Sequence, residues 1–192
     1  MTGIALIGPA GAGKSTVGEV LAGLLDRDFV DIDAIGDRYY VQVGQPISEL
    51  VERIESDGFR RAHRWWQPAR LAALAALTDF PTSVIALGAG HSHFEDESCF
   101  EEAQRALESA FVVLLLPSPD PTESLRVLRE RCEHDKGTDW RRDGHYFLEE
   151  WIGSMQNHSL ADLVVFGEGR SATEIARQIA SHVSPIRSDE PC

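Results

Sequence analysis

The chain has 192 residues, 43% of them hydrophobic and 26% charged, which is ordinary for a globular protein with a sizeable core. The formal net charge of −13 argues against nucleic acid as a partner, and no apolar run approaches the ~20 residues that span a membrane. We therefore expect one domain over residues 1–183 and a flexible tail over 184–192. The expected partners are small molecules rather than nucleic acid or a membrane, with the chain a monomer or homodimer.

The first predicted strand, residues 4–7, leads into a glycine-rich segment that matches the P-loop pattern G-x-x-x-x-G-K-S. A helix follows, because Val17, Leu21 and Leu24 recur at helical spacing. In such a loop, backbone N–H groups surround a polyphosphate, while the lysine reaches its β- and γ-phosphates and the serine binds Mg²⁺. The segment therefore predicts an ATP and magnesium site made of Gly8, Gly11, Ala12, Gly13, Lys14, Ser15 and Thr16.

The position of this loop and the cysteine content both bear on location. The chain reaches the loop within eight residues, which leaves no room for a signal peptide. The three cysteines, Cys99, Cys132 and Cys192, show neither metal-ligand spacing nor an obvious pairing. Both features favour a reducing, cytoplasmic environment.

The second predicted strand, residues 29–33, ends in two acids, Asp31 and Asp33. On a strand, residues two apart share a face, so we expect both carboxylates beside the nucleotide. One acid can orient Mg²⁺ and the other can accept hydrogen bonds or the proton of an attacking hydroxyl. The alternative is that the pair only ends the strand and caps a helix. Residues 46–77 look helical, with a kink or break at Pro68.

The third predicted strand, residues 83–87, runs into Gly88, Ala89, Gly90 and His91. The two glycines allow the backbone to approach a substrate closely. An acid at the end of this strand and an N-K-x-D tetrapeptide for guanine are both missing from the sequence. These absences argue against a GTPase or a motor.

The rest of the chain continues the alternation of helices and strands. A helix carrying Phe100, Ala103, Ala106, Leu107 and Ala110 precedes an unalternated apolar strand, residues 111–116. A helix begins near Pro121, residues 134–144 are polar, and residues 162–166 form the last strand before a helix capped by Ser171. The pattern predicts an α/β fold of three layers, α/β/α, with a five-stranded parallel sheet and the ligand at the carboxyl ends of the strands.

Four segments resemble the shikimate kinase family of P-loop kinases. They are the extended phosphate loop at residues 8–18, the D-x-D at 31–33, the F-R pair at 59–60 and the glycine loop at 88–90. The resemblance implies a small-molecule kinase in which Asp31 acts near Mg²⁺ and Asp33 binds the acceptor hydroxyl as the candidate base. It further implies that Arg60 holds the acceptor's carboxylate. We expect helices around residues 35–78 to bind the acceptor, with Gly88, Ala89, Gly90 and His91 lining its site.

A lid is expected at about residues 129–143, where Arg131 is the candidate for bringing positive charge to the transferred group. Departures from the family gather on the acceptor side. Position 63 is His instead of Glu, the middle glycine is Ala89, the R-P-L-L stretch is missing, and residues 153–158 lack the family's second carboxylate-binding arginine. A carboxylate that arginines hold bidentately needs that partner. We therefore expect an acceptor other than shikimate: a cyclitol, a sugar or a specialised metabolite.

Three alternatives stay open. A nucleoside or nucleotide kinase would need arginines for an acceptor phosphate, and the arginine cluster at residues 60–70 keeps this possible. A non-catalytic nucleotide-binding regulator is the second alternative, although the intact loop and acids weigh against it. The third is a metal site at His91, His93, Glu95 and Asp96, against which a substrate-lining loop is favoured.

Overall fold

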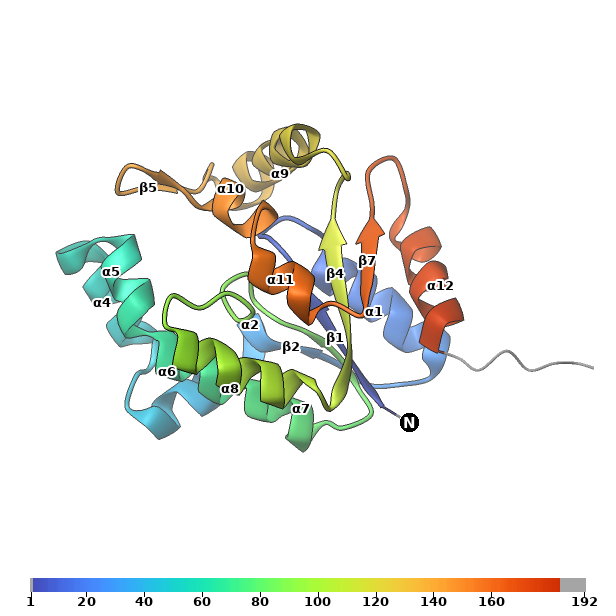
Figure 1. Cartoon of the computed structure of the whole chain (residues 1–192), viewed down its shortest axis with the longest axis horizontal. Coiled ribbons are helices and arrows are strands. Elements are labelled where there is room, and N and C mark those ends of the chain that lie inside the picture. The colour runs from blue at the N-terminus through green and yellow to red at the C-terminus, as the bar shows by residue number, and fades with distance from the viewer. Residues whose placement is uncertain (1, 184–192) are drawn as a thin grey trace, which may run out of the picture.

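The computed structural model describes residues 2–183, and a five-stranded parallel sheet lies at its centre (Figure 1). The spatial order of the strands is β2-β3-β1-β4-β7. The predicted parallel sheet is therefore confirmed, and β1 has neighbours on both sides. The strands are β1 (Gly3–Ile7), β2 (Phe29–Asp31), β3 (Val84–Ala86), β4 (Ala110–Leu116) and β7 (Leu163–Phe166).

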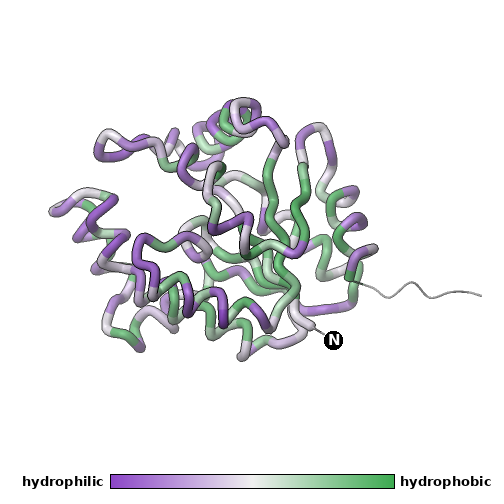
Figure 2. Tube along the Cα trace, viewed as in Figure 1, coloured by the Kyte–Doolittle hydropathy of each residue, from purple (hydrophilic) through white to green (hydrophobic). Residues whose placement is uncertain are grey.

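Successive residues of β1 face two different cores, which makes the protein three layers thick. Ile4 and Leu6 pack with helices α1 and α12, while Ala5 and Ile7 pack on the opposite face with α8. The hydropathy of the chain follows this arrangement, because the central strands are apolar and the covering helices alternate (Figure 2). The covering helices named here are α1 (Lys14–Leu25), α8 (Glu97–Leu107) and α12 (Ala172–Val183).

In the sequence, the segment between β2 and β3 forms a series of short helices. The helical prediction is confirmed there, but the chain breaks at Gly58 and Trp66, not at Pro68, which lies in the first turn of α6. Proline is tolerated in a first turn, since the N–H that it lacks has no helical partner there. The elements are α2 (Ile32–Ile35), α3 (Asp37–Tyr40), η1 (Val41–Val43), α4 (Ile47–Asp57), α5 (Phe59–Trp65), α6 (Gln67–Ala72), η2 (Ala73–Ala75) and α7 (Ala76–Asp79).

The segment that was expected to be only polar contains a β-hairpin. Strands β5 (Arg141–Arg142) and β6 (His145–Tyr146) pair antiparallel around Asp143 and Gly144, both of which have positive φ. That backbone suits a two-residue hairpin turn, for which Asp-Gly is a favoured sequence. The neighbouring helices are α9 (Pro121–Lys136), α10 (Phe147–Ile152) and α11 (Met155–Leu160).

Some predicted boundaries were wrong. Ala110 belongs to β4 and not to the helix before it. β2 ends at Asp31, so Asp33 lies on a helix and not on the strand face that we predicted. The reason is local: the Asp31 side chain accepts a hydrogen bond from the Asp33 N–H at 2.9 Å and caps α2.

The predicted cap of the last helix is confirmed. Ser171 accepts from the Glu174 N–H at 3.3 Å, and Glu174 accepts in return from the Ser171 N–H at 2.8 Å. This reciprocal pair is a capping box. The predicted tail, residues 184–192, lies outside the described residues. Within residues 2–183, the helices are too short or too polar to cross a lipid bilayer.

Candidate active site

The P-loop joins β1 to α1 at the carboxyl edge of the sheet. Gly8 has a φ of 135°, and a Cβ there would lie 2.4 Å from the Leu115 carbonyl oxygen. Glycine is therefore required, because a side chain would meet rigid backbone of the neighbouring strand. The bend turns the chain over the sheet edge and begins α1 at Lys14, so the helix N-terminus faces the loop.

The Lys14 side chain curls back over this loop. Its Nζ donates to the carbonyl oxygens of Gly8 and Pro9 at 2.8 and 2.9 Å. Burial lowers the pKa of Lys14 to about 8, and the nearby Asp33 carboxylate works against that shift. The ammonium group is therefore half-buried at the cavity, and this partial removal from water strengthens its attraction for an anion.

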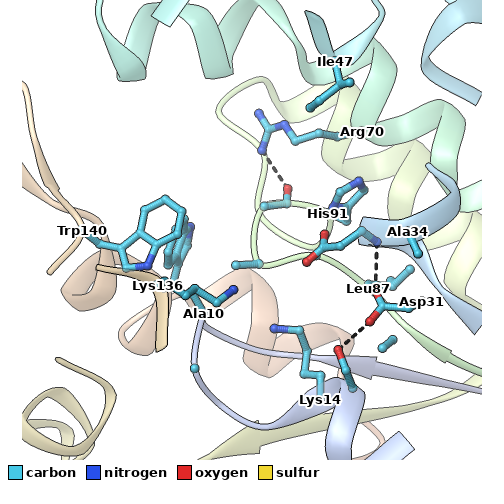
Figure 3. A pocket seen from close by; sticks show the side chains of 18 of the residues that line it. Ala10, Lys14, Asp31, Ala34, Ile47, Arg70, Leu87, His91, Lys136 and Trp140 are labelled. Atoms are coloured by element: carbon cyan, nitrogen blue, oxygen red, sulfur yellow. Dashed lines mark hydrogen bonds between the residues drawn. The ribbon is translucent and has the colours of Figure 1, made fainter. Parts of the chain in front are cut away.

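Ser15 and Asp31 bring two oxygen atoms together beside Lys14. The Ser15 hydroxyl donates to Asp31 Oδ2 at 2.6 Å, and the second oxygen of Asp31 is the cap of α2 (Figure 3). Hydroxyl and carboxylate oxygens are the hard ligands that Mg²⁺ takes in nucleotide sites. The chemistry of this pair therefore fits the predicted magnesium ion.

Asp33 faces the same space from α2, despite leaving the strand. A Cβ on Gly88 would lie 2.6 Å from Asp33 Oδ1 and also 2.6 Å from His91 Nδ1. The carboxylate and the imidazole thus meet over the bare Cα of Gly88, and a larger residue there would displace one or both of them. The glycine loop after β3 therefore serves close packing of two side chains at the cavity.

A cavity of about 710 Å³ joins these parts (Figure 3). We name its two sides by the elements that line them. The P-loop side is lined by Ala10, Gly11, Gly13, Lys14, Ser15 and Thr16, together with Asp135 and Lys136 of α9. The helical side is lined by Asp33, Ala34, Asp37, Tyr40, Ile47, Leu50, His63, Trp66 and Arg70, together with Gly88, Ala89, Gly90 and His91.

Arg70 reaches the helical side from α6 and is almost completely buried. Its guanidinium pairs with Glu95 at 2.7 Å and donates to the carbonyl oxygens of His63, Gly90 and His93 at 2.7 to 3.0 Å. Four of its five N–H groups are therefore engaged by the protein, and its charge is matched by a carboxylate. The fifth, on Nε, is buried without a partner among the described residues.

Two histidines on the helical side are uncharged at neutral pH. Burial, with a smaller contribution from the positive charge of Arg70, lowers the pKa of His63 and of His91 to about 3. His91 Nε2 lies 2.9 Å from the Tyr40 hydroxyl, and its Nδ1 is buried without a partner among residues 2–183. Burial also raises the pKa of Tyr40, so this phenol keeps its proton.

Two predicted arginines lie elsewhere. Arg60 is exposed and contacts the β5–β6 hairpin: its guanidinium lies 2.8 Å from His145 Nε2, and its backbone N–H donates to Asp143. Arg131 donates to the Gly11 carbonyl oxygen at 3.3 Å from outside the cavity lining. Their assigned roles stay predictions.

The predicted glycine loop, by contrast, lines the cavity throughout. Sequence reasoning missed Lys136, Asp37, Tyr40, Trp140 and Trp151, all of which line the cavity. Lys136 carried a signal: it is one of only two lysines in a chain with sixteen arginines.

The metal-site alternative at residues 91–96 is not supported. Within the described part of the chain, His, Cys, Asp and Glu form no cluster of three that could hold a metal. His93 instead lies 3.1 Å from the Ser154 hydroxyl, Glu95 pairs with Arg70, and Asp96 accepts from Gln67 at 2.7 Å. These three side chains hold the loop in place, and of the four residues in the proposed metal site only His91 lines the cavity.

Fold and loop together define an α/β protein of the P-loop class, and comparisons with known proteins narrow this further. The sequence profile of the shikimate kinase family matches residues 10–184, so the chain belongs to that family. Shikimate kinase 2 of Shigella dysenteriae serotype 1 is 46% identical over 85 residues, 44% of this chain and 42% of the relative. That aligned stretch therefore spans less than half the length of the relative.

Solved structures agree on the fold. Shikimate kinase from Acinetobacter baumannii, in complex with shikimate, has a TM-score of 0.69 at 22% identity, covering 95% of this chain and 93% of that one. Shikimate kinase from Aquifex aeolicus has a TM-score of 0.60 at 21% identity, covering 93% and 94%. At these identities the likeness speaks for the fold alone.

Proposed function

We propose that this protein is a kinase that moves the γ-phosphoryl group of ATP to a hydroxyl group of a small molecule. The observation that carries the proposal is one cavity that contains both the P-loop lysine, Lys14, and the carboxylate of Asp33. A triphosphate held by the loop and an alcohol held by the carboxylate would meet in that space. Family membership supports the same reaction class.

Catalysis would rest on positioning and on charge neutralisation. The loop amides and Lys14 hold the β- and γ-phosphates, while Ser15 and Asp31 are the residues that would hold Mg²⁺. When bound, Mg²⁺ neutralises charge on the phosphate oxygens. Asp33 is exposed to the cavity, orients the acceptor hydroxyl along the line of attack and accepts its proton.

The lid proposed at residues 129–143 covers the end of α9 and the β5–β6 hairpin. The hairpin is tied to the helical region through the Arg60 and Asp143 contact, while Arg131 is tied to the P-loop through Gly11. A closed lid keeps water, a competing acceptor, away from the phosphoryl group. We propose Arg131 as the arginine that reaches the transferred group on closure.

The acceptor is proposed to be a cyclitol, a sugar or a specialised metabolite in place of shikimate. The Acinetobacter relative was solved with shikimate, which makes that compound the natural reference ligand. The acceptor side of this chain differs from the family at His63 and Ala89 and in residues 153–158.

The test measures ADP release across a panel of hydroxylated small molecules, together with calorimetry using a nonhydrolysable ATP analogue and Mg²⁺. Lys14→Ala is expected to abolish turnover. Asp33→Asn is expected to abolish turnover but to keep nucleotide affinity within about twofold, since the amide keeps the shape and loses the base. Asp28→Asn, an exposed carboxylate outside the cavity lining, is the matched control. Absence of nucleotide binding by folded wild-type protein would refute the proposal.

A further inference from the structure

The charges of the cavity are divided unequally between its two sides. Within the described residues, three basic side chains line it: Lys14, Lys136 and Arg70. Both lysines belong to the P-loop side, and they lie close enough for the charge of Lys136 to lower the pKa of Lys14. Figure 3 places Arg70 and Ile47 opposite Lys14. The helical side therefore has Arg70 as its one described cation.

The terminal nitrogens of Arg70 are not available to an incoming anion, and its Nε, which lacks a partner among the described residues, is buried. Its charge is matched by Glu95 at 2.7 Å, and both of its terminal nitrogens are occupied by carbonyl oxygens. Glu95 neutralises Arg70 from outside the cavity lining, so a carboxylate or phosphate in the cavity would have to break contacts of Arg70 that are already buried. Arg70 thus brings no unmatched charge to the cavity.

The other ionisable groups of the helical side are neutral or negative. His63 and His91 stay uncharged at neutral pH because burial lowers the pKa of each to about 3. Asp33 and Asp37 are carboxylates with exposed side chains, and Asp37 accepts one hydrogen bond, from the Ile47 N–H at 2.8 Å. An anionic group beside these two carboxylates would face like charge, and the nearest unmatched cation, Lys14, is the one that the phosphates of the nucleotide would occupy.

The uncharged surfaces of this side suit a ring that carries hydroxyl groups. The rings of Tyr40 and Trp66 meet edge to face, with their centroids 4.5 Å apart. Both residues are mostly buried and line the cavity. Aromatic faces pack against the C–H faces of a polyol ring, while Asp33 and Asp37 accept from its hydroxyls. His91 Nδ1 adds a buried polar atom that still lacks a partner among the described residues.

We infer that the acceptor is an uncharged cyclic polyol, without a carboxylate or phosphate group, and that the Arg70–Glu95 pair sets this specificity. The inference rests on the proposed kinase function and names the class of its acceptor. It disfavours the nucleotide-kinase alternative, because an acceptor phosphate has no unmatched cation to bind on the helical side. It also replaces the predicted carboxylate-binding role of Arg60, which contacts His145 of the hairpin and lies outside the cavity lining.

The experiment compares two probes that differ in one charge: shikimate, a carboxylate, and its methyl ester, which keeps the ring and the hydroxyls. Each is titrated into the full chain in the presence of Mg²⁺ and a nonhydrolysable ATP analogue. We expect the ester to bind at least about tenfold more tightly than the acid, because the carboxylate of the acid would face Asp33 and Asp37 without a cation of its own. An acid that binds as tightly as its ester, or an ester that does not bind, would overturn the inference.

A variant tests the role of the pair. Glu95→Gln leaves Arg70 with an unmatched charge and is expected to improve the affinity for shikimate about tenfold relative to the ester. Glu97→Gln, an exposed carboxylate on the first turn of α8, is the matched control and should change neither affinity. If Glu95→Gln melts cooperatively and its ratio of shikimate affinity to ester affinity equals that of the wild type, the Arg70–Glu95 pair does not set the specificity.

If Glu95→Gln does not fold, the salt dependence of wild-type binding tests whether the acceptor site repels a carboxylate. The affinity for shikimate should rise with added salt, which screens the repulsion from Asp33 and Asp37, while the affinity for the ester stays flat. A shikimate affinity that falls with salt would mean that a cation holds the carboxylate. Binding of the ATP analogue is measured separately, so its loss would count against the kinase function and not against the acceptor class.

Discussion

The affinity for nucleotide should depend on pH through Lys14. In the empty site, burial lowers the pKa of this lysine to about 8, against 10.5 for a solvated lysine. A bound triphosphate places several negative charges beside the ammonium and raises that pKa again. Binding above pH 8 must therefore be accompanied by uptake of a proton, and a higher pH should weaken it.

The size of the effect follows from the two protonation states. With a pKa near 8, Lys14 is about 90% charged at pH 7 and about 10% charged at pH 9, so the apparent affinity should fall about tenfold between them. That change corresponds to about 1.4 kcal/mol of binding free energy. The terminal phosphate of ATP itself adds little to this change, because the last proton of a phosphate monoester leaves near pH 6.

Isothermal titration calorimetry with a nonhydrolysable ATP analogue measures both quantities. Titrations in buffers of different ionisation enthalpy should give uptake of about half a proton at pH 8. Lys14→Arg is the control, since its guanidinium stays charged over this range and its affinity should not vary with pH. An affinity of the wild-type protein that is constant from pH 7 to pH 9, without proton uptake, would refute the assignment of a buried, titrating lysine.

Three further outcomes are expected. Lys14→Met should raise the free energy of unfolding of the empty protein by about 1–2 kcal/mol at pH 7, measured by urea denaturation. The reason is that a base whose pKa is lowered in the folded state destabilises the fold below that pKa, and this cost fades between pH 8 and 10.5. A loss of stability in the variant would contradict this. Gly88→Ala should abolish turnover and spare nucleotide affinity, since its methyl would lie 2.6 Å from Asp33 Oδ1; ADP release and calorimetry check both. Ser171→Ala should cost about 1 kcal/mol of stability by removing the capping box of α12, and an unchanged denaturation midpoint would exclude it.

The parts of the protein that sequence could predict are those built from contiguous residues. The P-loop, the five strands and the capping box at Ser171 each follow from a short pattern that acts on its own backbone. The prediction that the strand continues past Asp31 was wrong, because Asp31 can either extend the strand or cap the next helix with its side chain. The hydrogen bond from the Asp33 N–H to Asp31 shows that it caps the helix. The β5–β6 hairpin was missed, although Asp143 and Gly144 are a favoured turn pair.

The helical side of the cavity was less predictable, because its character depends on pairs far apart in the chain. Arg60 and Arg70 look alike in sequence, yet one is exposed beside the hairpin and the other is buried against Glu95. The two arginines lie on different helices, Arg60 on α5 and Arg70 on α6, which the break at Trp66 separates. Composition counts both arginines as charges, whereas the fold neutralises one of them.

This division of charge also determines which way round the ligands enter. A triphosphate at the P-loop side meets Lys14 and Lys136 together with the carboxylate of Asp135, whereas the same ligand at the helical side would meet Asp33 and Asp37 beside neutral histidines and a neutralised Arg70. The difference in potential across one cavity favours a single orientation of the nucleotide before any specific contact forms. The acceptor position is thereby left to a ligand that needs no cation. Orientation of the donor and neutrality of the acceptor are thus two consequences of one arrangement of charges.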